Sequence, residues 1–312
     1  MQRRSGVSYI KSIFPKKQKL EIAFGEHIID GKVRQKIDNR NFSVEVIVKS
    51  GENQYTNYFR RLGLRYIEIH SDEELEIEFI SLLPCQYPLN KISADFPDPI
   101  DQKIYDTSLR TLELCMHDHY EDCPWREQAL YTMDSGNQIL CGYYAFKEFR
   151  FSRSVLYLMS QDNRKDRLLS ICFPTSIDLT IPSFSFFYFL EVYEYTVYSG
   201  DITLFKSILP KMESIISAFL ERRVDGLIQN FTDKHHWNFY EWVDGLNGNL
   251  GSESAPTADA ALNCLCSLAL SCLDKLYSLS GLKSDYQKIA NEMNAEISFS
   301  AKRRILYQQR QQ

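Results

Sequence analysis

The first 98 residues alternate apolar and polar positions in short runs, with Gly, Asn or Asp between the runs. The runs rich in Val, Ile and Phe cover residues 20–24, 42–49, 66–70 and 75–81. Glutamates alternate with apolar residues inside them, as at Glu76 and Glu78, which is typical of strands with one solvated face. The pattern predicts a β-sandwich, or a large part of one, over residues 1–98.

The pattern changes at the proline pair Pro97 and Pro99, which favours a linker because proline continues neither a helix nor a β-ladder. Apolar residues then recur at helical spacing. Six helical stretches are predicted, at 104–116, 138–159, 184–198, 202–220, 258–279 and 286–297. The stretch 138–159 is long enough for two helices or one bent helix. Asp201 is the expected N-cap of 202–220, which Pro210 should kink or divide. Residues 99–312 are therefore predicted to form a helical domain.

Composition narrows the class of protein. A chain of 312 residues with 44% hydrophobic and 13% aromatic residues can bury a large core. A net charge of −5 argues against nucleic acid as a partner, and the basic residues before position 20 are expected to be solvated surface. Neither an apolar run of about 20 residues nor a signal-peptide core of about 7–15 is visible. We therefore expect a cytoplasmic protein without a membrane partner, and the sequence leaves open whether it forms a homo-oligomer.

The eight cysteines are not placed like a disulfide framework. Cys264, Cys266 and Cys272 fall inside one apolar helical stretch, so we expect reduced, mostly buried thiols. The spacings of Cys264 with Cys266 and of His117 with His119 are too short for a zinc site. No metal and no cofactor are predicted.

One segment concentrates charge in aromatic surroundings. Asp122-Cys-Pro-Trp-Arg-Glu127 is followed seven residues later by Asp134. Carboxylates in an apolar setting are what glycoside hydrolysis requires, because one must stay protonated while another stays ionised. Asp122 can cap a helix whose first turn tolerates proline. If that helix continues, Glu127, Tyr131 and Asp134 lie on one face. Taken alone, however, Glu127 is better explained as a first-turn glutamate that is paired with Arg126 or stabilised by the helix dipole.

The same segment resembles the signature of the α-L-rhamnosidases of glycoside hydrolase family 78, in its Asp, Cys-Pro, Arg, Glu and final Asp. Residues 25–31 and 60–67 are also similar to the β-domain that precedes the catalytic barrel in that family. The departures from the signature are Trp125 for Gln, Gln128 for Arg, Tyr131 for Trp and Met133 for Gly. The resemblance implies a multidomain β + α fold, in which a β-sandwich portion is followed by an incomplete (α/α)6 barrel.

The resemblance also implies roles. Glu127 would be the general acid of an inverting mechanism that removes terminal α-L-rhamnose from a glycoside or oligosaccharide. Asp122 and Asp134 would bind the rhamnose hydroxyls and hold negative charge near the oxocarbenium-like transition state. Arg126 would orient one of these carboxylates, or form only a structural ion pair. Tyr131 keeps an aromatic surface in the sugar pocket.

A second aromatic constellation lies at residues 235–244. Trp237 and Trp242 stand beside Glu241 and Asp244, and sugar rings stack their C–H faces on such aromatic planes. Rhamnosidases have a similar segment in a barrel loop, so both tryptophans are candidate substrate-binding residues. Filling a core is the competing interpretation. The glycine-rich stretch 245–251 is expected to be a loop, and it lacks the context of a phosphate-binding loop.

The general base implied by the family lies on a later barrel helix, which by count from Glu127 falls beyond Gln312. We therefore expect the chain to hold the acid part of the site without its base. Glu241, Asp244 and Glu253 are substitutes that the sequence does not rank. Two alternatives remain open. One is a catalytically inactive truncated homologue that retains at most carbohydrate binding, and the other is a six-hairpin glycosidase with a different sugar specificity.

Overall fold

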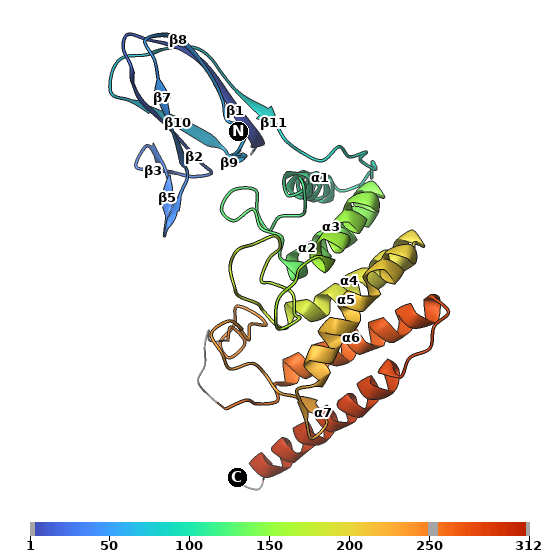
Figure 1. The fold of residues 1–312 in the computed structure, drawn as a ribbon. Helices are drawn as coiled ribbons and strands as arrows, with labels where there is room; N and C mark the ends of the chain where they lie inside the picture. Colours follow the sequence, from blue (N-terminus) through green and yellow to red (C-terminus); the bar gives the residue numbers. More distant parts are fainter. Residues whose placement is uncertain (1–3, 249–254, 310–312) are drawn as a thin grey trace. The chain divides into compact units, whose positions relative to one another are not determined.

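The computed structural model describes residues 4–248 and 255–309 (Figure 1). The chain divides into two compact units, Met1–Ala129 and Leu130–Gln312. Most of the strands and one helix belong to the first unit, and the other helices belong to the second. The predicted order, strands followed by helices, is confirmed. The predicted domain boundary between residues 98 and 99 stays a prediction.

Most strands of the first unit form two antiparallel sheets. In one sheet β1 lies between β8 and β11 and also pairs with β9. In the other, β2 lies between β7 and β10. The strands of the first sheet are β1 (Arg4–Phe14), β8 (Gly51–Thr56), β9 (Leu62–Leu64) and β11 (Glu76–Pro84). Those of the second are β2 (Gln18–Gly25), β7 (Ser43–Val48) and β10 (Tyr66–Ser71). Two short hairpins connect β2 to β7, formed by β3 (Ile28–Ile29), β4 (Lys32–Val33), β5 (Lys36–Ile37) and β6 (Arg40–Asn41).

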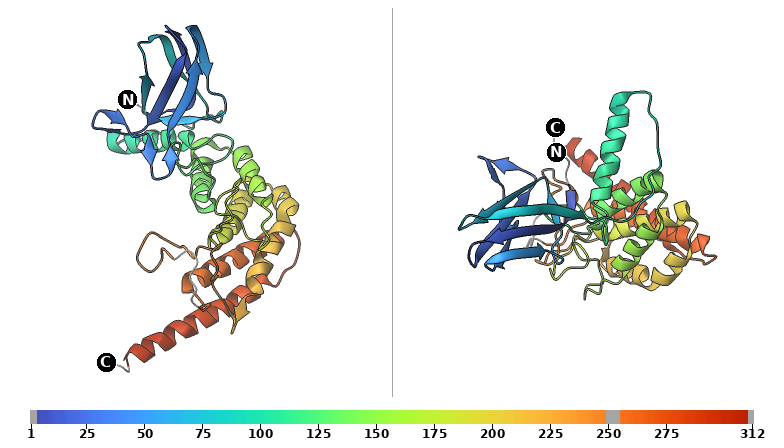
Figure 2. Two further views of the ribbon diagram at one scale, coloured as in Figure 1. Left: turned by 60° about the vertical axis from the view of Figure 1, so that its left-hand side comes forward. Right: turned by 90° about the horizontal axis from the view of Figure 1, so that it is seen from above.

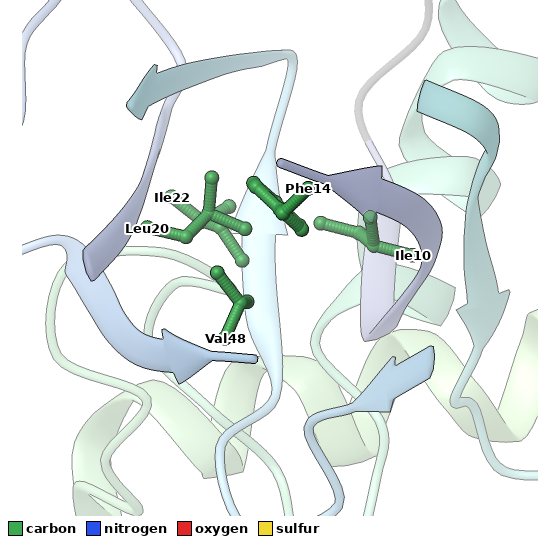
Figure 3. Close-up of a cluster of buried hydrophobic side chains, with 5 residues drawn as sticks. All are labelled: Ile10, Phe14, Leu20, Ile22 and Val48. Carbon is green, nitrogen blue, oxygen red and sulfur yellow. The ribbon is translucent and has the colours of Figure 1, made fainter. Parts of the chain in front are cut away.

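The two sheets share a buried apolar cluster. Ile10 and Phe14 of β1 pack with Leu20, Ile22 and Val48 of the other sheet (Figure 3). All five side chains are almost completely removed from solvent. Burial of this apolar surface is the main force that holds the sheets face to face.

Strand β1 was missed by sequence reasoning, which expected only solvated surface before residue 20. Its inward positions do alternate, but two of them are serines. Ser8, Ile10, Ser12 and Phe14 are all buried, and Lys11 between them is ion-paired with Glu78 on β11. The basic side chains that follow, at Lys16, Lys17 and Lys19, are exposed as expected. Arg3 and the side chain of Arg4 lie outside the described residues.

The proline pair leads directly into helix α1 (Pro99–Leu114). Asp98 caps this helix, because its Oδ1 accepts the Ile100 N–H at 2.7 Å. Pro99 occupies the first turn, where its missing N–H costs no hydrogen bond. The prolines therefore set the start of a helix.

The second unit is built of helices joined by loops. Helix α4 packs between α2 and α6, α7 packs along α6, and α3 packs on α5 (Figure 2). The helices are α2 (Thr132–Phe146), α3 (Arg150–Ser160), α4 (Phe184–Ser199), α5 (Thr203–Leu220), α6 (Ala260–Leu279) and α7 (Tyr286–Gln309). A short hairpin of β12 (Arg223–Val224) and β13 (Leu227–Ile228) follows α5.

Two local predictions in this unit are resolved by the structure. Residues 138–159 contain parts of two separate helices, α2 and α3. Helix α5 continues through Pro210 as a single element, so the expectation of a division there is wrong. Pro210 is exposed, and water can satisfy the carbonyl that loses its helical partner. The N-cap of α5 is Ile202, one residue after the predicted Asp201. Asp201 still supports the start of the helix, because its Oδ1 accepts the Thr203 N–H at 2.8 Å.

Among the described residues, one helix is long and apolar enough to span a membrane, namely α6. More than half of it is buried inside the unit, where it packs against α4 and α7. Such burial is expected of a core helix in a two-layered helical arrangement.

Candidate functional site

The acidic segment forms a loop, and the predicted helix through Glu127, Tyr131 and Asp134 is wrong. Residues 124–127 make a turn, and Gln128 then adopts a left-handed conformation with φ of 55°, which interrupts a right-handed helix. Asp122 closes the loop by donating its N–H to the Ala129 carbonyl and accepting the Ala129 N–H on Oδ1, both at 3.0 Å. Helix α2 begins only at Thr132.

The 122–129 loop is anchored in the core of the first unit through Trp125. Its side chain is 8% exposed and belongs to a cluster with Phe24, Phe42, Leu62 and Leu64. The Trp125 and Phe42 ring centroids lie 4.9 Å apart. At the position where the family signature has glutamine, this chain thus carries an aromatic anchor.

Backbone packing fixes the same loop from the side of β9. A Cβ atom on Gly63 would lie 1.8 Å from the Pro124 carbonyl oxygen, so only glycine permits this approach. The Gln128 side chain donates to the same carbonyl at 2.8 Å. The turn that carries Glu127 is therefore held by both backbone and side-chain contacts.

The Glu127 carboxyl is the centre of the charged contacts in this loop. Its Oε1 accepts from Arg40 Nη2 at 3.2 Å and lies 3.3 Å from Arg126 Nη2. A carboxylate oxygen of Asp122, the Cys123 sulfur and a carboxylate oxygen of Glu127 all lie within 4.8 Å of one another. The Glu127 backbone N–H also donates to Cys123 Sγ at 3.4 Å. The structure thus brings together three predicted residues, namely Asp122, Arg126 and Glu127.

Burial raises the pKa of Glu127 above its ordinary value, and the hydrogen bond and negative charge of Asp122 raise it further. The charges of Arg126 and Arg40 oppose this shift without cancelling it. A carboxyl that stays protonated to higher pH is suited to donate a proton.

The same three side chains, Asp122, Cys123 and Glu127, are also the described group whose spacing would fit a metal ion. Metal binding needs a thiolate, whereas burial and Asp122 raise the pKa of Cys123. The pKa of Glu127 is raised as well. Both shifts favour the protonated forms of these two groups, and a cation that bound here would have to displace those protons.

The second unit holds the other predicted residues. Asp134 is exposed in the first turn of α2, and Tyr131 is the residue that precedes this helix. Tyr131 packs with Trp237 against an apolar cluster that includes Phe184 and Phe239. An acidic group at the start of a helix is favoured by the helix dipole.

The rings of Trp237 and Trp242 lie next to each other in the loop before α6. Their ring centroids are 5.6 Å apart, and Trp242 also lies 4.8 Å from the Phe239 ring. The Trp237 indole N–H donates to the Asn247 carbonyl at 2.9 Å. Trp242 is 74% exposed. Trp237 therefore supports the loop, while Trp242 presents an open aromatic face.

Two of the three candidate substitutes for the general base lie among the described residues, and both are exposed. Glu241 accepts the Trp242 N–H on Oε1 at 2.7 Å, which ties it to its own loop. Asp244 is exposed in the following turn. Glu253, with the later part of the glycine-rich stretch 245–251, lies outside the described residues.

Arg40, for which the sequence suggested no role, contacts the Glu127 carboxylate from β6, 87 residues earlier in the chain. The sequence suggested no role for His236 either. That ring lies between Asp233 Oδ1 at 2.7 Å and Asp166 Oδ2 at 3.1 Å, and it stacks on Phe231. These side chains border a cavity of about 400 Å³ in the second unit. No local motif signals either contact.

A profile described as the bacterial α-L-rhamnosidase six-hairpin glycosidase domain matches residues 96–305. The chain belongs to this rhamnosidase family. The family resemblance that the segment from Asp122 to Asp134 indicated is thereby confirmed. The classification as a hydrolase, a glycosidase and a six-hairpin glycosidase is confirmed with it. No curated protein matches the chain.

Solved rhamnosidases share the fold. The family 78 rhamnosidase of Bacillus sp. GL1 aligns with a TM-score of 0.81 and 23% identity over 95% of this chain and 30% of its own. The Klebsiella oxytoca rhamnosidase with rhamnose bound aligns with a TM-score of 0.73 and 17% identity, over 94% of this chain and 60% of its own. The Streptomyces avermitilis α-L-rhamnosidase complexed with L-rhamnose aligns with a TM-score of 0.71 and 13% identity, over 96% of this chain and 29% of its own. This rhamnosidase-family chain therefore spans about three tenths to three fifths of the length of these relatives.

Proposed function

We propose that this chain carries the acid side of an α-L-rhamnosidase site, with Glu127 as the general acid. The observation that carries the proposal is the partly buried Glu127 carboxyl beside Asp122, whose pKa is raised by that setting. Family membership supplies the reaction class, and two structural relatives are described with rhamnose. The substrate is accordingly a rhamnose-containing glycoside or oligosaccharide.

In the proposed reaction, Glu127 gives its proton to the glycosidic oxygen while the bond from that oxygen to the anomeric carbon breaks. A water molecule, deprotonated by a general base, attacks the opposite face of the sugar and inverts the anomeric configuration. Asp122 and Asp134 bind rhamnose hydroxyls, and Arg126 orients the Glu127 carboxyl. Tyr131, Trp237 and Trp242 supply the aromatic surface.

Asp122 is not the base in this scheme. Its carboxylate comes within 4.8 Å of that of Glu127, whereas inverting enzymes separate the two carboxyl groups by about 6.5–9.5 Å to accommodate the water. Asp122 instead helps to keep Glu127 protonated. The base is contributed from outside the 122–129 loop.

The proposed domain organisation follows the same relatives. Residues 1–98 form part of a β-sandwich, as the shared core of the two sheets supports. Residues 99–312 form part of an (α/α)6 barrel, as the row of α2, α4 and α6 with α3 and α5 packed beside it supports.

The test is hydrolysis of two α-L-rhamnosides, one with a 4-nitrophenyl leaving group and one with a simple alkyl leaving group. A good leaving group needs little protonation, so Glu127→Gln should slow the alkyl rhamnoside much more than the aryl one. General acids contribute about 10²–10⁴-fold. Glu74→Gln, an exposed glutamate of the first unit, is the matched control and should change neither rate.

Equal losses on both substrates would contradict the role of Glu127. Absence of turnover by well-folded protein that still binds L-rhamnose would instead favour the binding-only alternative. Cleavage of another aryl glycoside in preference to the rhamnoside would identify a different sugar specificity.

A further inference from the structure

The first unit contains a pocket whose lining is strongly basic. It has a volume of about 310 Å³, at the lower end of the range for small-molecule sites. Four guanidinium groups border it, with aromatic rings and two amides between them. The lining residues are Arg40, Arg60, Arg61, Arg126, Phe24, Phe42, Trp125, Asn41 and Gln128. We call the site formed by these residues the arginine pocket.

The charges of these arginines are only partly compensated. Arg40 and Arg126 share one carboxylate, that of Glu127, and Arg61 is ion-paired with Glu121. Arg60 has no carboxylate partner among the residues that the structure describes. A pocket with this surplus of positive charge favours an anion.

Arg60 is held in place without neutralisation of its charge. Its Nη1 donates to the Ser43 carbonyl at 2.9 Å, and its Nη2 donates to the Asn41 carbonyl at 2.5 Å. The guanidinium also lies over the Phe24 ring, 5.0 Å from the centroid. Burial lowers the pKa of Arg60, which reflects a desolvated cation. A guanidinium has five N–H groups. These contacts use two of them, fix the orientation of the group and leave others for a ligand.

The pocket shares two of its arginines with the proposed acid. Because the acid protonates the glycosidic oxygen, groups that contact the same arginines lie on the leaving-group side of the bond. We propose that the arginine pocket binds the carboxylate of an acidic sugar that carries the rhamnose to be removed. The inference rests on the proposed role of Glu127 and extends it to a substrate class, the α-L-rhamnosides of uronic acids.

Binding there would also assist the chemistry. A carboxylate on Arg40 and Arg126 would neutralise the two cations that oppose protonation of Glu127. Its own negative charge would add to that of Asp122. An acidic leaving group would therefore keep the acid protonated to higher pH than a neutral one.

The first arm of the test measures binding by titration calorimetry with the full chain, at one low ionic strength because salt screens such contacts. The probes are D-glucuronate, methyl β-D-glucopyranoside and inorganic sulfate. Glucuronate should bind at least about tenfold more tightly than the neutral glucoside, as charge-assisted hydrogen bonds allow. Arg126→Gln and Arg60→Gln should each abolish most of this preference. Arg34→Gln makes the same charge change at an exposed position outside the pocket and should preserve it.

Arg60 also donates to two backbone carbonyls, so its replacement can disturb the fold. Circular dichroism therefore checks that the Arg60 variant is folded. Arg126, whose side chain is half exposed, provides the measurement if the Arg60 variant does not fold. Equal affinity for glucuronate and the glucoside would overturn the proposal. So would sulfate binding as tightly as glucuronate, since the pocket would then recognise any small anion.

The second arm compares kcat/KM for a rhamnosyl glucuronide and a rhamnosyl glucoside. The glucuronide should be preferred about tenfold or more, and Arg126→Gln should lose the preference. Turnover of both without preference would refute the acidic-sugar inference and leave the proposed function intact. If neither substrate nor an aryl rhamnoside is cleaved, the proposed function fails, and the binding arm alone decides whether the pocket takes a uronate.

Discussion

Replacement of Trp125 by alanine should release the 122–129 loop from the first unit. The side chain is 8% exposed and contacts Phe42. A tryptophan buries roughly 150–250 Å², which at about 25 cal/mol per Å² corresponds to roughly 4–6 kcal/mol. Alanine retains a small part of this, and buried Trp→Ala changes typically cost about 3–5 kcal/mol. We expect a loss in that range for the unit that holds the loop.

The loss is best measured locally, because a chain of two units need not unfold in one step. Hydrogen exchange of β2 and β9, which pack beside Trp125, reports the stability of this unit in the absence of denaturant. Trp125→Phe should restore most of the protection, since it refills the site with an apolar ring.

Trp242→Ala is the matched control, since the same substitution removes a side chain that is 74% exposed. It should change stability by less than about 1 kcal/mol. A Trp125→Ala effect as small as that of the control would refute the idea that this residue anchors the loop. Retention of full activity by a loosened loop would likewise show that Glu127 does not depend on the anchor.

Three further outcomes follow from the contacts described above. Asp122→Asn keeps the oxygen that accepts the Ala129 N–H but removes the charge that raises the pKa of Glu127. Because the proposed acid donates a proton, it must be protonated to act. In this variant the fall of kcat at high pH should therefore begin at a lower pH. A pH–rate profile with its high-pH side unchanged would contradict the interaction between Asp122 and Glu127. Glu191 of α4 is buried, and desolvation raises its pKa well above 4.5. The free energy of unfolding should therefore fall as pH rises from about 4.5 toward the folded-state pKa. The decline should reach up to about 1.4 kcal/mol per pH unit. Glu191→Gln should flatten that decline in thermal unfolding followed against pH, and an equal slope in both proteins would exclude Glu191 as its source. The Asn263 side chain accepts the Ile228 N–H at 2.7 Å and donates to the Ile228 carbonyl at 3.0 Å. Asn263→Ala should therefore lower the free energy of unfolding by about 2 kcal/mol or more, because it leaves buried polar groups unpaired. Hydrogen exchange at β13 measures this loss, and a much smaller loss would contradict the role of these hydrogen bonds.

The helices were the most predictable part of the fold, because apolar residues at helical spacing dominate their sequences. Helix α4, for example, buries Tyr188, Val192 and Tyr195 on one side, and its predicted range differs from the observed one by a single residue. The stop at Gly200, which is left-handed with φ of 73°, was also readable from sequence.

Strand β1 was not predictable by hydrophobic alternation. Ser8 and Ser12 occupy inward positions that the pattern reserves for apolar residues, while basic residues nearby suggested a solvated segment. Small hydroxyl side chains fit between two closely packed sheets, so tertiary packing decided the strand.

The geometry of the 122–129 loop was not predictable from the sequence. The spacing of Glu127, Tyr131 and Asp134 suggested one helical face, whereas the left-handed Gln128 and the burial of Trp125 make a loop. Both features depend on residues distant in sequence, such as Gly63 and Phe42. Arg40 was invisible for the same reason, since its contact with Glu127 joins segments 87 residues apart.

Gly63 allows β9 to approach the Pro124 carbonyl of the 122–129 loop, and it does so from within the β-rich unit. Glu127, the proposed proton donor, and the arginine pocket therefore lie together within residues 1–129. Exchange of this segment between rhamnosidases would transfer the acid together with its preference for a charged or neutral leaving group. Selectivity for the leaving group would then evolve by changes in the β-rich unit, while the loop of the second unit that bears Trp237 and Trp242 remains untouched.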